Sequence, residues 1–493
     1  MSYARGSALF SLLVLFTTLA HAVGVTAYSQ GTSSPIQITG NASSSHPISG
    51  WAIYVDSNLV FRQNTSLTKI TASVNFATGS HNVVVRAWDT TGAFGNAYLT
   101  VTPQVSSASV STVSTTSGSV PCQAFSLSMN NYYNPWPSVS PCSKRLWDTG
   151  AIWKNINPSY GHYYWNWLDT LMAQARQHGA DVAFTFGVVP AFASTNPGLT
   201  GCAYANGACA APRLSDWTAF VDALSRHSAQ NKAAGRGHIG AYELWNEPDA
   251  GNWWRGTTSQ MLAMAQVAYR IIHANDPTAV VVSPAPQGIY GWRWTLGYLA
   301  IGGGKYADVI GMHGYLPRGT SQPEYYLNFL LTNTKAAMAK YGVSWKPIWD
   351  MEASWTANSY LPSDYQRMAF LSRSYILRLF NGVRRFYWYS WDNTLYGTLW
   401  SSSRGIHPAG VAYGQVSKWL VGAALGSCSV SSSVWTCNIS RGGGYVGRLV
   451  WNQTGSSWYR PSTTYKRYRD LYGGTHTVTG SFTITQLPVL LEN

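Results

Sequence analysis

Two glutamates close short β-like segments of the sequence. Glu247 stands between an asparagine and a proline in the run Tyr242–Pro248, and Glu352 lies among aromatic residues in Trp349–Trp355. Cleavage of a glycosidic bond needs one carboxyl group to protonate the leaving oxygen and another to attack or assist at the sugar carbon. The two groups stand about 5 Å apart when the sugar keeps its configuration. Burial raises the pKa of one carboxyl group and hydrogen-bond donors keep the other ionised, so two glutamates can take these different roles.

Two more acids lie close to this pair in the sequence. Asp350 precedes Glu352 by two residues, and the two-residue period of a strand points both side chains the same way. Asp350 is therefore either a deeper, buried partner of Glu352 or a rival nucleophile. Glu243 shares the parity of Glu247 but lies a full pleat deeper, so we expect it to pair with a basic group or with hydroxyls.

The elements that must position these acids begin after Cys122, where apolar β-like runs alternate with helix-like stretches. This alternation is typical of parallel β/α units. The eight β-like runs are Ala124–Met129, Lys144–Asp148, Asp181–Phe186, Gly240–Trp245, Val280–Ser283, Val309–His313, Ile348–Met351 and Arg384–Tyr389. Eight runs over about 290 residues predict an α/β fold, a (β/α)8 TIM barrel at 122–421. An open doubly wound sheet is the alternative, but no Gly-x-Gly-x-x-Gly follows an early strand.

Helix-like stretches separate most of these runs, although none is apparent after the first. They are Trp165–His178, Ser215–Ala233, Thr258–Asn275, Glu324–Tyr341 and Pro362–Leu379. In such a barrel the catalytic groups lie where strands end and the following loops begin. Glu247 and Glu352 stand at the ends of strands four and seven, which face each other, so the fold is expected to bring them into one pocket.

The motif Trp245-Asn246-Glu247-Pro248 at strand four, with a glutamate at the tip of strand seven, resembles glycoside hydrolase clan A. This clan comprises retaining (β/α)8-barrel glycosidases, and the pattern covers the chain from Cys122 to Gly410. The segment 145–150 (Arg-Leu-Trp-Asp-Thr-Gly), a later Trp153 and an appended β-domain are most similar to family 39-like and related family 5-like bacterial enzymes.

This resemblance implies roles for five residues. Glu247 is the acid/base, Glu352 is the nucleophile, and Asn246 bonds the sugar hydroxyl next to the reacting carbon. His313 and Tyr315 match a pair that lines the clan's site and steadies the nucleophile. For His313 the alternative is a satisfied histidine of the core.

Three further residues are assigned to substrate binding. The resemblance implies that Trp391, just past strand eight, is the stacking platform beneath the reacting sugar, and that Arg145 lies near the nucleophile. Trp153 is a candidate for an outer sugar subsite, as are Tyr163, Trp253 and Trp254. Packing in the core is the alternative for each of these residues and for Trp391.

The segments outside the barrel predict further modules. Residues 1–22 have the charge, apolar run and small residues of an export signal, so a secreted protein is expected. Alternating residues at 34–103 predict a β-sandwich that resembles bacterial immunoglobulin-like modules and that serves spacing or binding. Residues 104–121 are rich in Ser and Thr and are read as a linker. The segment 422–493 predicts a second β-sandwich.

Six cysteines in an exported chain predict three disulfides. The pairs chosen among fifteen connectivities are Cys122–Cys142, Cys202–Cys209 and Cys428–Cys437. No Cys-x-x-Cys, Cys/His cluster or His-Glu-x-x-His is present, so no zinc site is predicted. The chemistry above needs neither a metal nor an organic cofactor.

The composition bears on the partner. The net charge of +14 reflects few acids (19) as much as many Lys and Arg residues (33), and the basic residues are scattered. This favours an anionic polysaccharide or an acidic surface over nucleic acid. The 23 tryptophans and 31 tyrosines exceed what a core requires, and flat aromatic faces stack on sugar rings.

We therefore predict a secreted, monomeric enzyme acting on a β-linked polysaccharide or oligosaccharide, with no membrane span after the signal. The rival hypothesis is a non-catalytic carbohydrate-binding or adhesion protein on a barrel scaffold. The identity of the sugar and the choice between internal and terminal cleavage depend on loops that the sequence does not specify.

Overall fold

The computed structural model describes residues 23–31, 35–74, 76, 80–103 and 118–493. The chain divides into two compact units, Met1–Ala108 and Ser109–Asn493. The predicted export signal at 1–22 and most of the predicted linker lie outside the described residues.

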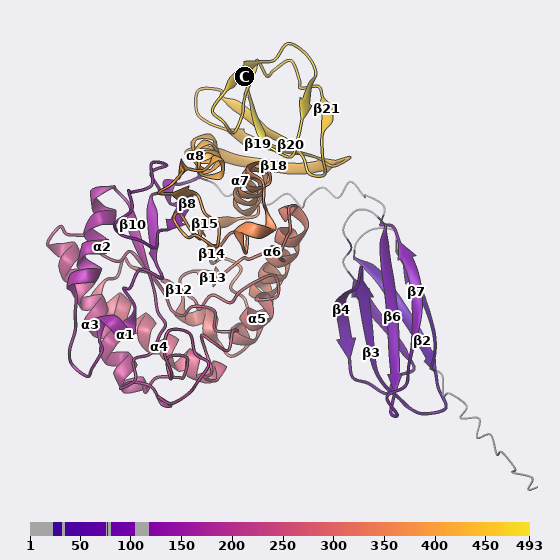
Figure 1. Cartoon of the computed structure of the whole chain (residues 1–493), viewed down its shortest axis with the longest axis horizontal. Coiled ribbons are helices and arrows are strands. Elements are labelled where there is room, and N and C mark those ends of the chain that lie inside the picture. The colour runs from indigo at the N-terminus through magenta and orange to yellow at the C-terminus, as the bar shows by residue number, and fades with distance from the viewer. Residues whose placement is uncertain (1–22, 32–34, 75, 77–79, 104–117) are drawn as a thin grey trace, which may run out of the picture. The chain divides into compact units, whose positions relative to one another are not determined.

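The first unit is a β-sandwich of two antiparallel sheets (Figure 1). One sheet contains β1 (Gly24–Gln30), β2 (Ile36–Ser43) and β5 (Lys69–Val74); the other contains β4 (Asn58–Gln63), β3 (Ile48–Val55), β6 (His81–Asp89) and β7 (Phe94–Val101). The module begins earlier than residue 34, because β1 pairs with β2 along its whole length. The weakly apolar sequence GVTAYSQ of β1 carries little strand signal, which is why it was not predicted.

The second unit contains a closed barrel of eight parallel strands. Neighbours pair in the order β12-β11-β10-β9-β8-β15-β14-β13, and a parallel bridge between Val282 and Val309 joins the two ends. The strands are β8 (Phe125–Ser128), β9 (Ser143–Leu146), β10 (Asp181–Thr185), β11 (Ala241–Glu243), β12 (Val280–Val282), β13 (Ile310–Met312), β14 (Ile348–Ala353) and β15 (Val383–Trp388). The predicted TIM barrel is confirmed, and each strand overlaps its predicted run.

Helices surround this barrel. Five overlap predicted stretches: α2 (Asn166–Gln177), α3 (Leu214–Ala233), α4 (Thr258–Asn275), α6 (Pro323–Lys340) and α7 (Asp364–Phe380). The helices α1 (Trp153–Ile156), α5 (Trp292–Ala300) and α8 (Pro408–Leu420) were not predicted. Between β8 and β9, where the structure describes every residue, no α-helix is present, and the sequence likewise shows no helix-like stretch after the first run. Capping boxes at Thr257 and Ser363 fix the starts of α4 and α7.

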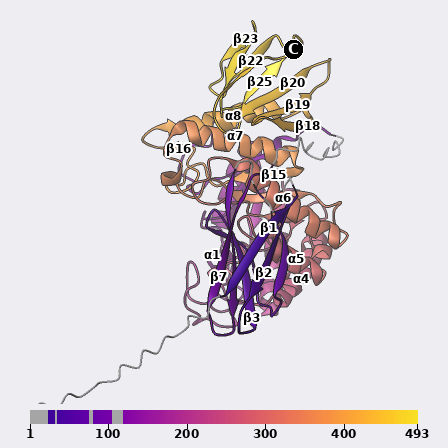
Figure 2. The ribbon, with the colours of Figure 1, turned by 90° about the vertical axis from the view of Figure 1, so that its right-hand side faces the viewer.

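A C-terminal β-domain packs on the barrel helices. One sheet contains β18 (Ala424–Ser431), β19 (Val434–Ser440), β20 (Val446–Asn452), β25 (Val489–Glu492), β22 (Arg467–Arg469) and β23 (Thr475–Thr477), and a second pairs β21 (Ser457–Tyr459) with β24 (Phe482–Ile484). Figures 1 and 2 both show β18–β20 beside α7 and α8. Trp435, Ile439 and Leu449 share one hydrophobic core with Tyr375 and Phe380 of α7, so this domain and the barrel form one unit.

The three predicted disulfides are all present. Cys122–Cys142 connects the approaches to β8 and β9, Cys202–Cys209 closes a loop after β10, and Cys428–Cys437 links β18 to β19. Each closes a loop that would otherwise gain entropy on unfolding.

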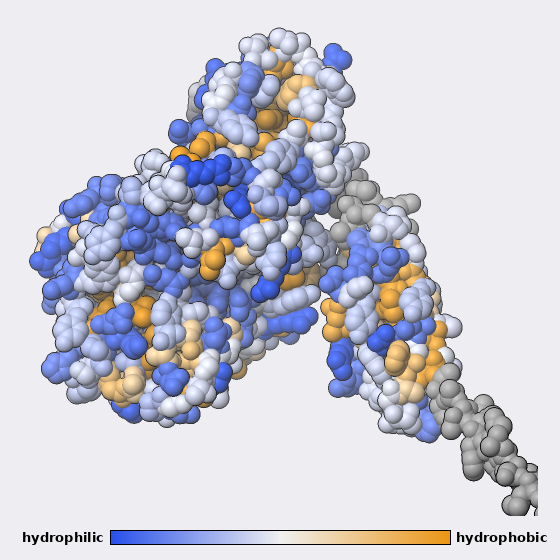
Figure 3. Space-filling view, in the orientation of Figure 1, coloured by the Kyte–Doolittle hydropathy of each residue, from blue (hydrophilic) through white to orange (hydrophobic). Residues whose placement is uncertain are grey.

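The surface is mainly hydrophilic on the barrel face turned to the viewer, with hydrophobic residues in small separate patches (Figure 3). Among the described residues no helix combines the length and hydropathy that crossing a membrane requires.

Candidate active site

A cavity of about 670 Å³ opens at the C-terminal ends of the barrel strands. Acidic, aromatic and amide side chains form its walls, as is usual for a site that binds a polar ligand with flat apolar faces. The lining includes Asp148, Glu247 and Glu352; Trp147, Tyr204, Trp253, Tyr315, Tyr360, Tyr389 and Tyr396; and Asn246, Gln287 and Arg318.

The two predicted carboxylates meet in this cavity. Oxygens of Glu247 and Glu352 lie within 4.8 Å of each other, and the residues are 8% and 7% exposed. Glu247 follows β11 in a left-handed backbone conformation with φ of 45°, which is unfavourable for a residue with a Cβ atom. Strain of this kind persists where surrounding structure enforces it, often at functional sites.

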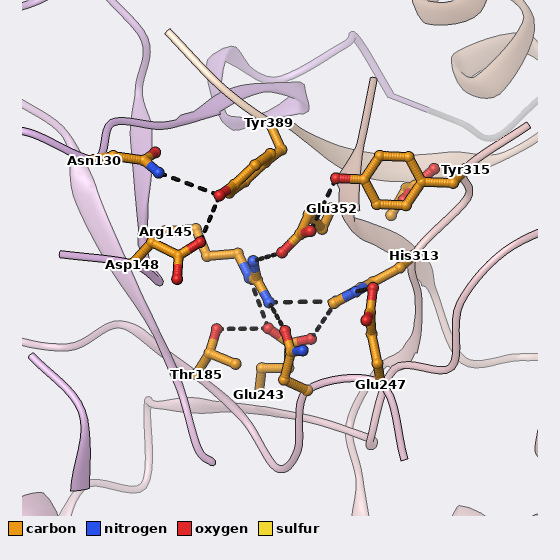
Figure 4. A network of polar contacts seen from close by, with 12 residues as sticks. Asn130, Arg145, Asp148, Thr185, Glu243, Glu247, His313, Tyr315, Glu352 and Tyr389 are labelled. Atoms are coloured by element: carbon orange, nitrogen blue, oxygen red, sulfur yellow. Dashed lines mark hydrogen bonds and ion pairs between the residues drawn. The ribbon is translucent and has the colours of Figure 1, made fainter. Parts of the chain in front are cut away.

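Arg145, on β9, lies at the centre of the network beneath the cavity (Figure 4). Its Nε donates to Glu243 Oε2 at 2.7 Å, its Nη1 donates to Glu352, and its Nη2 donates to Asn246 Oδ1 at 3.0 Å. The guanidinium is fully buried. Its planar array of donors can hold three partners at once, so it orients both the predicted nucleophile and the predicted sugar-binding amide.

Glu243 is a buried counter-ion to this arginine. Besides Arg145 it accepts hydrogen bonds from the Thr185 hydroxyl at 2.6 Å and from His313 Nε2 at 2.7 Å, so it has the basic and hydroxyl partners expected from the sequence. Burial alone would raise the pKa of Glu243, but Arg145 and His313 lower it to about 2. Glu243 therefore stays charged.

His313 connects Glu243 to Glu247. Its Nε2 donates to Glu243, and its Nδ1 lies 3.2 Å from Glu247 Oε1. Burial would lower the pKa of His313, but Glu243, Glu247 and Glu352 raise it to about 10. The imidazole is thus a cation that donates from both nitrogens at neutral pH. It contacts the predicted acid/base directly, whereas the resemblance implied a role at the nucleophile.

Glu352 is held from two sides. Tyr315 OH donates to its Oε1 at 2.9 Å, and Arg145 donates to its Oε2. Burial raises the pKa of Glu352 above 4.5, although Arg145 and His313 partly offset this effect. The carboxylate keeps lone pairs that these two donors do not occupy, so it can still react.

Asp350 does not share the orientation of Glu352, contrary to the strand-period argument. Its Oδ2 accepts from Arg378 Nε at 2.6 Å and its Oδ1 from Gly314 N at 2.9 Å. Because Arg378 belongs to α7, Asp350 faces the helices. The pairing of β14 with β15 shifts register between Asp350 and Ala353, and such an irregularity reverses the alternation. Asp350 is buried as expected, but it is not a rival nucleophile.

Two of the predicted stacking tryptophans, Trp153 and Trp391, do not reach the cavity. Trp153 is 0% exposed and stacks on Phe220 at 4.8 Å, and Trp391 is 1% exposed within the core. A side chain with no exposed face cannot stack on a sugar, so both substrate-binding assignments are corrected to core packing. The aromatic residue of strand eight that lines the cavity is Tyr389. The strand β15 ends at Trp388, so the two-residue alternation of an extended strand does not reach Trp391.

Several lining residues were missed by the sequence reasoning. Asp148 ends the β9 region and accepts hydrogen bonds from the hydroxyls of Tyr389 and Tyr204. Trp147 stands nearby, and its ring lies 5.4 Å from that of Trp253, a candidate subsite residue that does line the cavity. Asp148 and Trp147 carried a usable signal, because both lie just past the barrel strand β9. Tyr204, Tyr360 and Tyr396 lie on or beside loops whose path the sequence does not reveal.

Three side chains of this network also have the atom types of metal ligands. Glu247, His313 and Glu352 each offer an atom within 4.8 Å of the others. A metal-binding histidine must present an unprotonated nitrogen. Both ring nitrogens of His313 face carboxylates, at 2.7 Å from Glu243 and 3.2 Å from Glu247, so this arrangement is suited to sharing protons.

The comparisons with known proteins concern the fold. No protein-family model and no curated protein matches the sequence. The structure is similar to a family 39 glycoside hydrolase from Bacteroides cellulosilyticus WH2, with a TM-score of 0.62 and 15% identity over 95% of this chain and 97% of that one. It is also similar to a family 39 β-xylosidase from Caulobacter crescentus, with a TM-score of 0.55 and 17% identity over 76% of this chain and 97% of that one. A family 30 endoxylanase from Clostridium papyrosolvens C71 gives a TM-score of 0.54 and 16% identity, again over 76% of this chain and 97% of that one. These similarities confirm the predicted barrel fold.

Proposed function

We propose that the protein is a retaining glycoside hydrolase that cleaves a β-linked polysaccharide or oligosaccharide by double displacement. The observation that carries this proposal is the separation of the Glu247 and Glu352 oxygens, within 4.8 Å across an open cavity. Retaining enzymes hold their two carboxyl groups about 5–5.5 Å apart, whereas inverting enzymes leave room for a water between them. The xylosidase and xylanase activities of the structurally similar proteins agree with it.

In the first step Glu352 attacks the anomeric carbon while Glu247 gives its proton to the departing oxygen. A glycosyl ester forms on Glu352, and the bond to the leaving sugar breaks. Arg145 and Tyr315 hold the nucleophile in position. The imidazolium of His313, 3.2 Å from Glu247, stabilises the carboxylate that Glu247 becomes.

In the second step Glu247 takes a proton from an incoming water, whose oxygen replaces Glu352 at the anomeric carbon. The ester breaks and Glu352 returns to its charged form. The Asn246 amide group, fixed through Arg145, faces the cavity and is assigned to the hydroxyl beside the reacting carbon.

The proposed enzyme acts outside the cell as a monomer. Three disulfides support an oxidising destination. The rival function is a carbohydrate-binding protein without turnover, which would use the same aromatic cavity.

Product stereochemistry tests the proposal. We expect ¹H NMR of the reaction on aryl β-glycosides, including β-xylosides and β-glucosides, to detect the β-anomer of the sugar first. A first-formed α-anomer would refute double displacement. Absence of turnover on these substrates and on a panel of plant and bacterial polysaccharides, with saturable binding to one of them, would favour the rival function.

A further inference from the structure

The outer face of the four-stranded sheet in the first unit carries aromatic side chains around a cation. The Arg86 guanidinium lies 4.5 Å from the ring centre of Phe94, 5.6 Å from that of Tyr54 and 5.8 Å from that of Trp88. Arg62 lies 5.7 Å from the Trp88 ring. These distances are in the range of cation–π attraction.

Strand register places these groups on one face. Arg86 pairs with Ala52 on β3 and with Asn96 on β7, and its Nε donates to Asn96 Oδ1 at 2.8 Å. Trp88 pairs with Phe94, and Tyr98 lies four residues further along β7. The intervening residues of β6 are buried in the sandwich, so the aromatic and cationic side chains share the outer side, where β4, β3, β6 and β7 lie side by side (Figure 1).

Two of the four rings are exposed, and the cations are not neutralised. Phe94 and Tyr98 are 52% and 73% exposed. Within the described part of the first unit the only acids are Asp56 and Asp89. Asp56 pairs with His81, and Asp89 is buried and accepts hydrogen bonds from Ser and Thr hydroxyls. Neither guanidinium of this face therefore has a carboxylate partner among these residues.

We propose that this face, which we call the aromatic face (Tyr54, Arg62, Arg86, Trp88, Phe94, Asn96 and Tyr98), binds a polysaccharide that carries carboxylate groups. Exposed rings can stack on the apolar sides of sugars. A guanidinium with free N–H groups can hold a carboxylate through paired hydrogen bonds. The net charge of +14 draws an acidic polymer to the chain.

A nucleic acid is less suited to this face. Nucleic-acid affinity rises with the number of phosphates that cations neutralise, and the aromatic face offers only Arg62 and Arg86. The face has two cations and four aromatic rings. A polysaccharide in which only some sugars carry a carboxylate matches this ratio, because most of its sugars would stack on rings and few would need a cation. Binding here would raise the local concentration of polymer for any site on the same chain, and it does not depend on whether the barrel is hydrolytic.

Affinity electrophoresis of the full chain through gels containing a polymer tests the proposal. The probes are polygalacturonate, alginate and glucuronoxylan, each beside its carboxyl-reduced form. The variants are the double change Phe94→Ala with Tyr98→Ala, and Arg86→Gln. Matched controls on the opposite sheet are Tyr28→Ala and Lys69→Gln, whose positions on β1 and β5 are also exposed.

We expect at least one acidic polymer to retain the parent chain and its reduced form to retain it less. Both aromatic-face variants should bind about tenfold more weakly, while the controls bind like the parent and thermal unfolding is unchanged. The proposal is overturned if no acidic polymer retains the chain, if the reduced forms retain it equally, or if the variants bind like the parent. A different outcome is that double-stranded DNA retains the chain as strongly as the polymer does and that the same variants abolish this retention. This outcome would assign the face to nucleic acid instead.

Discussion

The two sides of β14 place similar ion pairs in different surroundings. On one side Asp350 and Arg378 are both buried, and their charges meet between the barrel and α7. On the other side Glu352 meets Arg145, but one edge of its carboxylate borders the cavity. A buried arginine–carboxylate pair is therefore not by itself a mark of function. The opening to a cavity is what distinguishes Glu352, the proposed nucleophile, from Asp350.

A third ion pair supports the same lesson. Glu324 of α6 accepts from Arg373 Nη1 and from Trp451 Nε1, both at 2.9 Å. This cluster connects two barrel helices to the C-terminal domain and borders no part of the cavity lining. The attraction between such buried charges offsets the cost of removing them from water only when every partner is in place. Their loss should therefore lower stability, whereas changes at Glu352 should lower activity.

The largest expected effect is on the cavity side. Glu352→Gln keeps the size of the side chain but removes the attacking charge, so kcat on aryl β-glycosides should fall by about 10⁴-fold or more. The thermal unfolding midpoint should not fall. A variant with kcat within an order of magnitude of the parent would exclude Glu352 as the nucleophile.

The helix side should respond in stability. Asp350→Ala leaves the buried guanidinium of Arg378 without its counter-ion, which we expect to lower the free energy of unfolding by about 3–5 kcal/mol. Denaturant titration measures this change, and kcat per folded molecule should match the parent. The double change Asp350→Leu with Arg378→Leu is the control, because replacing both charges by apolar groups should recover much of the loss. A loss of kcat in this stable double variant would show that Asp350 acts in the reaction.

Much of the site could be predicted because barrel topology fixes where strand ends meet. Arg145, Asn246, Glu247, His313 and Glu352 all lie at or just past such ends, and one network joins them. For these residues, local sequence and a fold class suffice to place the side chains near one another.

The predictions from the sequence failed where the two-residue period of a strand ended or did not apply. The register shift in β14 turned Asp350 away from Glu352. The strand β15 ends at Trp388, and Trp391, three residues later, lies in the core. Trp153 begins the short helix α1, whose inward face depends on packing against α3 and not on local pattern. Two-residue periodicity is a property of extended backbone, so it cannot reach across a bulge or a turn.

The pH dependence of activity tests whether Glu352, and not Asp350, is the acid of β14 that takes part in the reaction. Because the pKa of Glu352 is raised above 4.5 and the nucleophile must be charged, kcat/KM should fall on the acid side with a midpoint above 4.5. Tyr315→Phe removes a donor that favours the charged form, so the midpoint should move further up. A midpoint at or below 4.5 in the parent would contradict the assignment.

The smallest expected effect concerns two aromatic residues just past β15, Tyr389 in the cavity wall and Trp391 in the core. Tyr389→Phe removes the hydroxyl that donates to Asp148 and accepts from Asn130, and we expect kcat/KM to fall about tenfold. Trp391→Phe should leave kcat/KM within about twofold of the parent, because its ring is buried in the core. It should instead lower the unfolding midpoint, since a smaller ring leaves a void. If Trp391→Phe raised KM more than Tyr389→Phe did, the stacking role implied by the clan resemblance would be restored and the placement of this tryptophan in the core would be wrong.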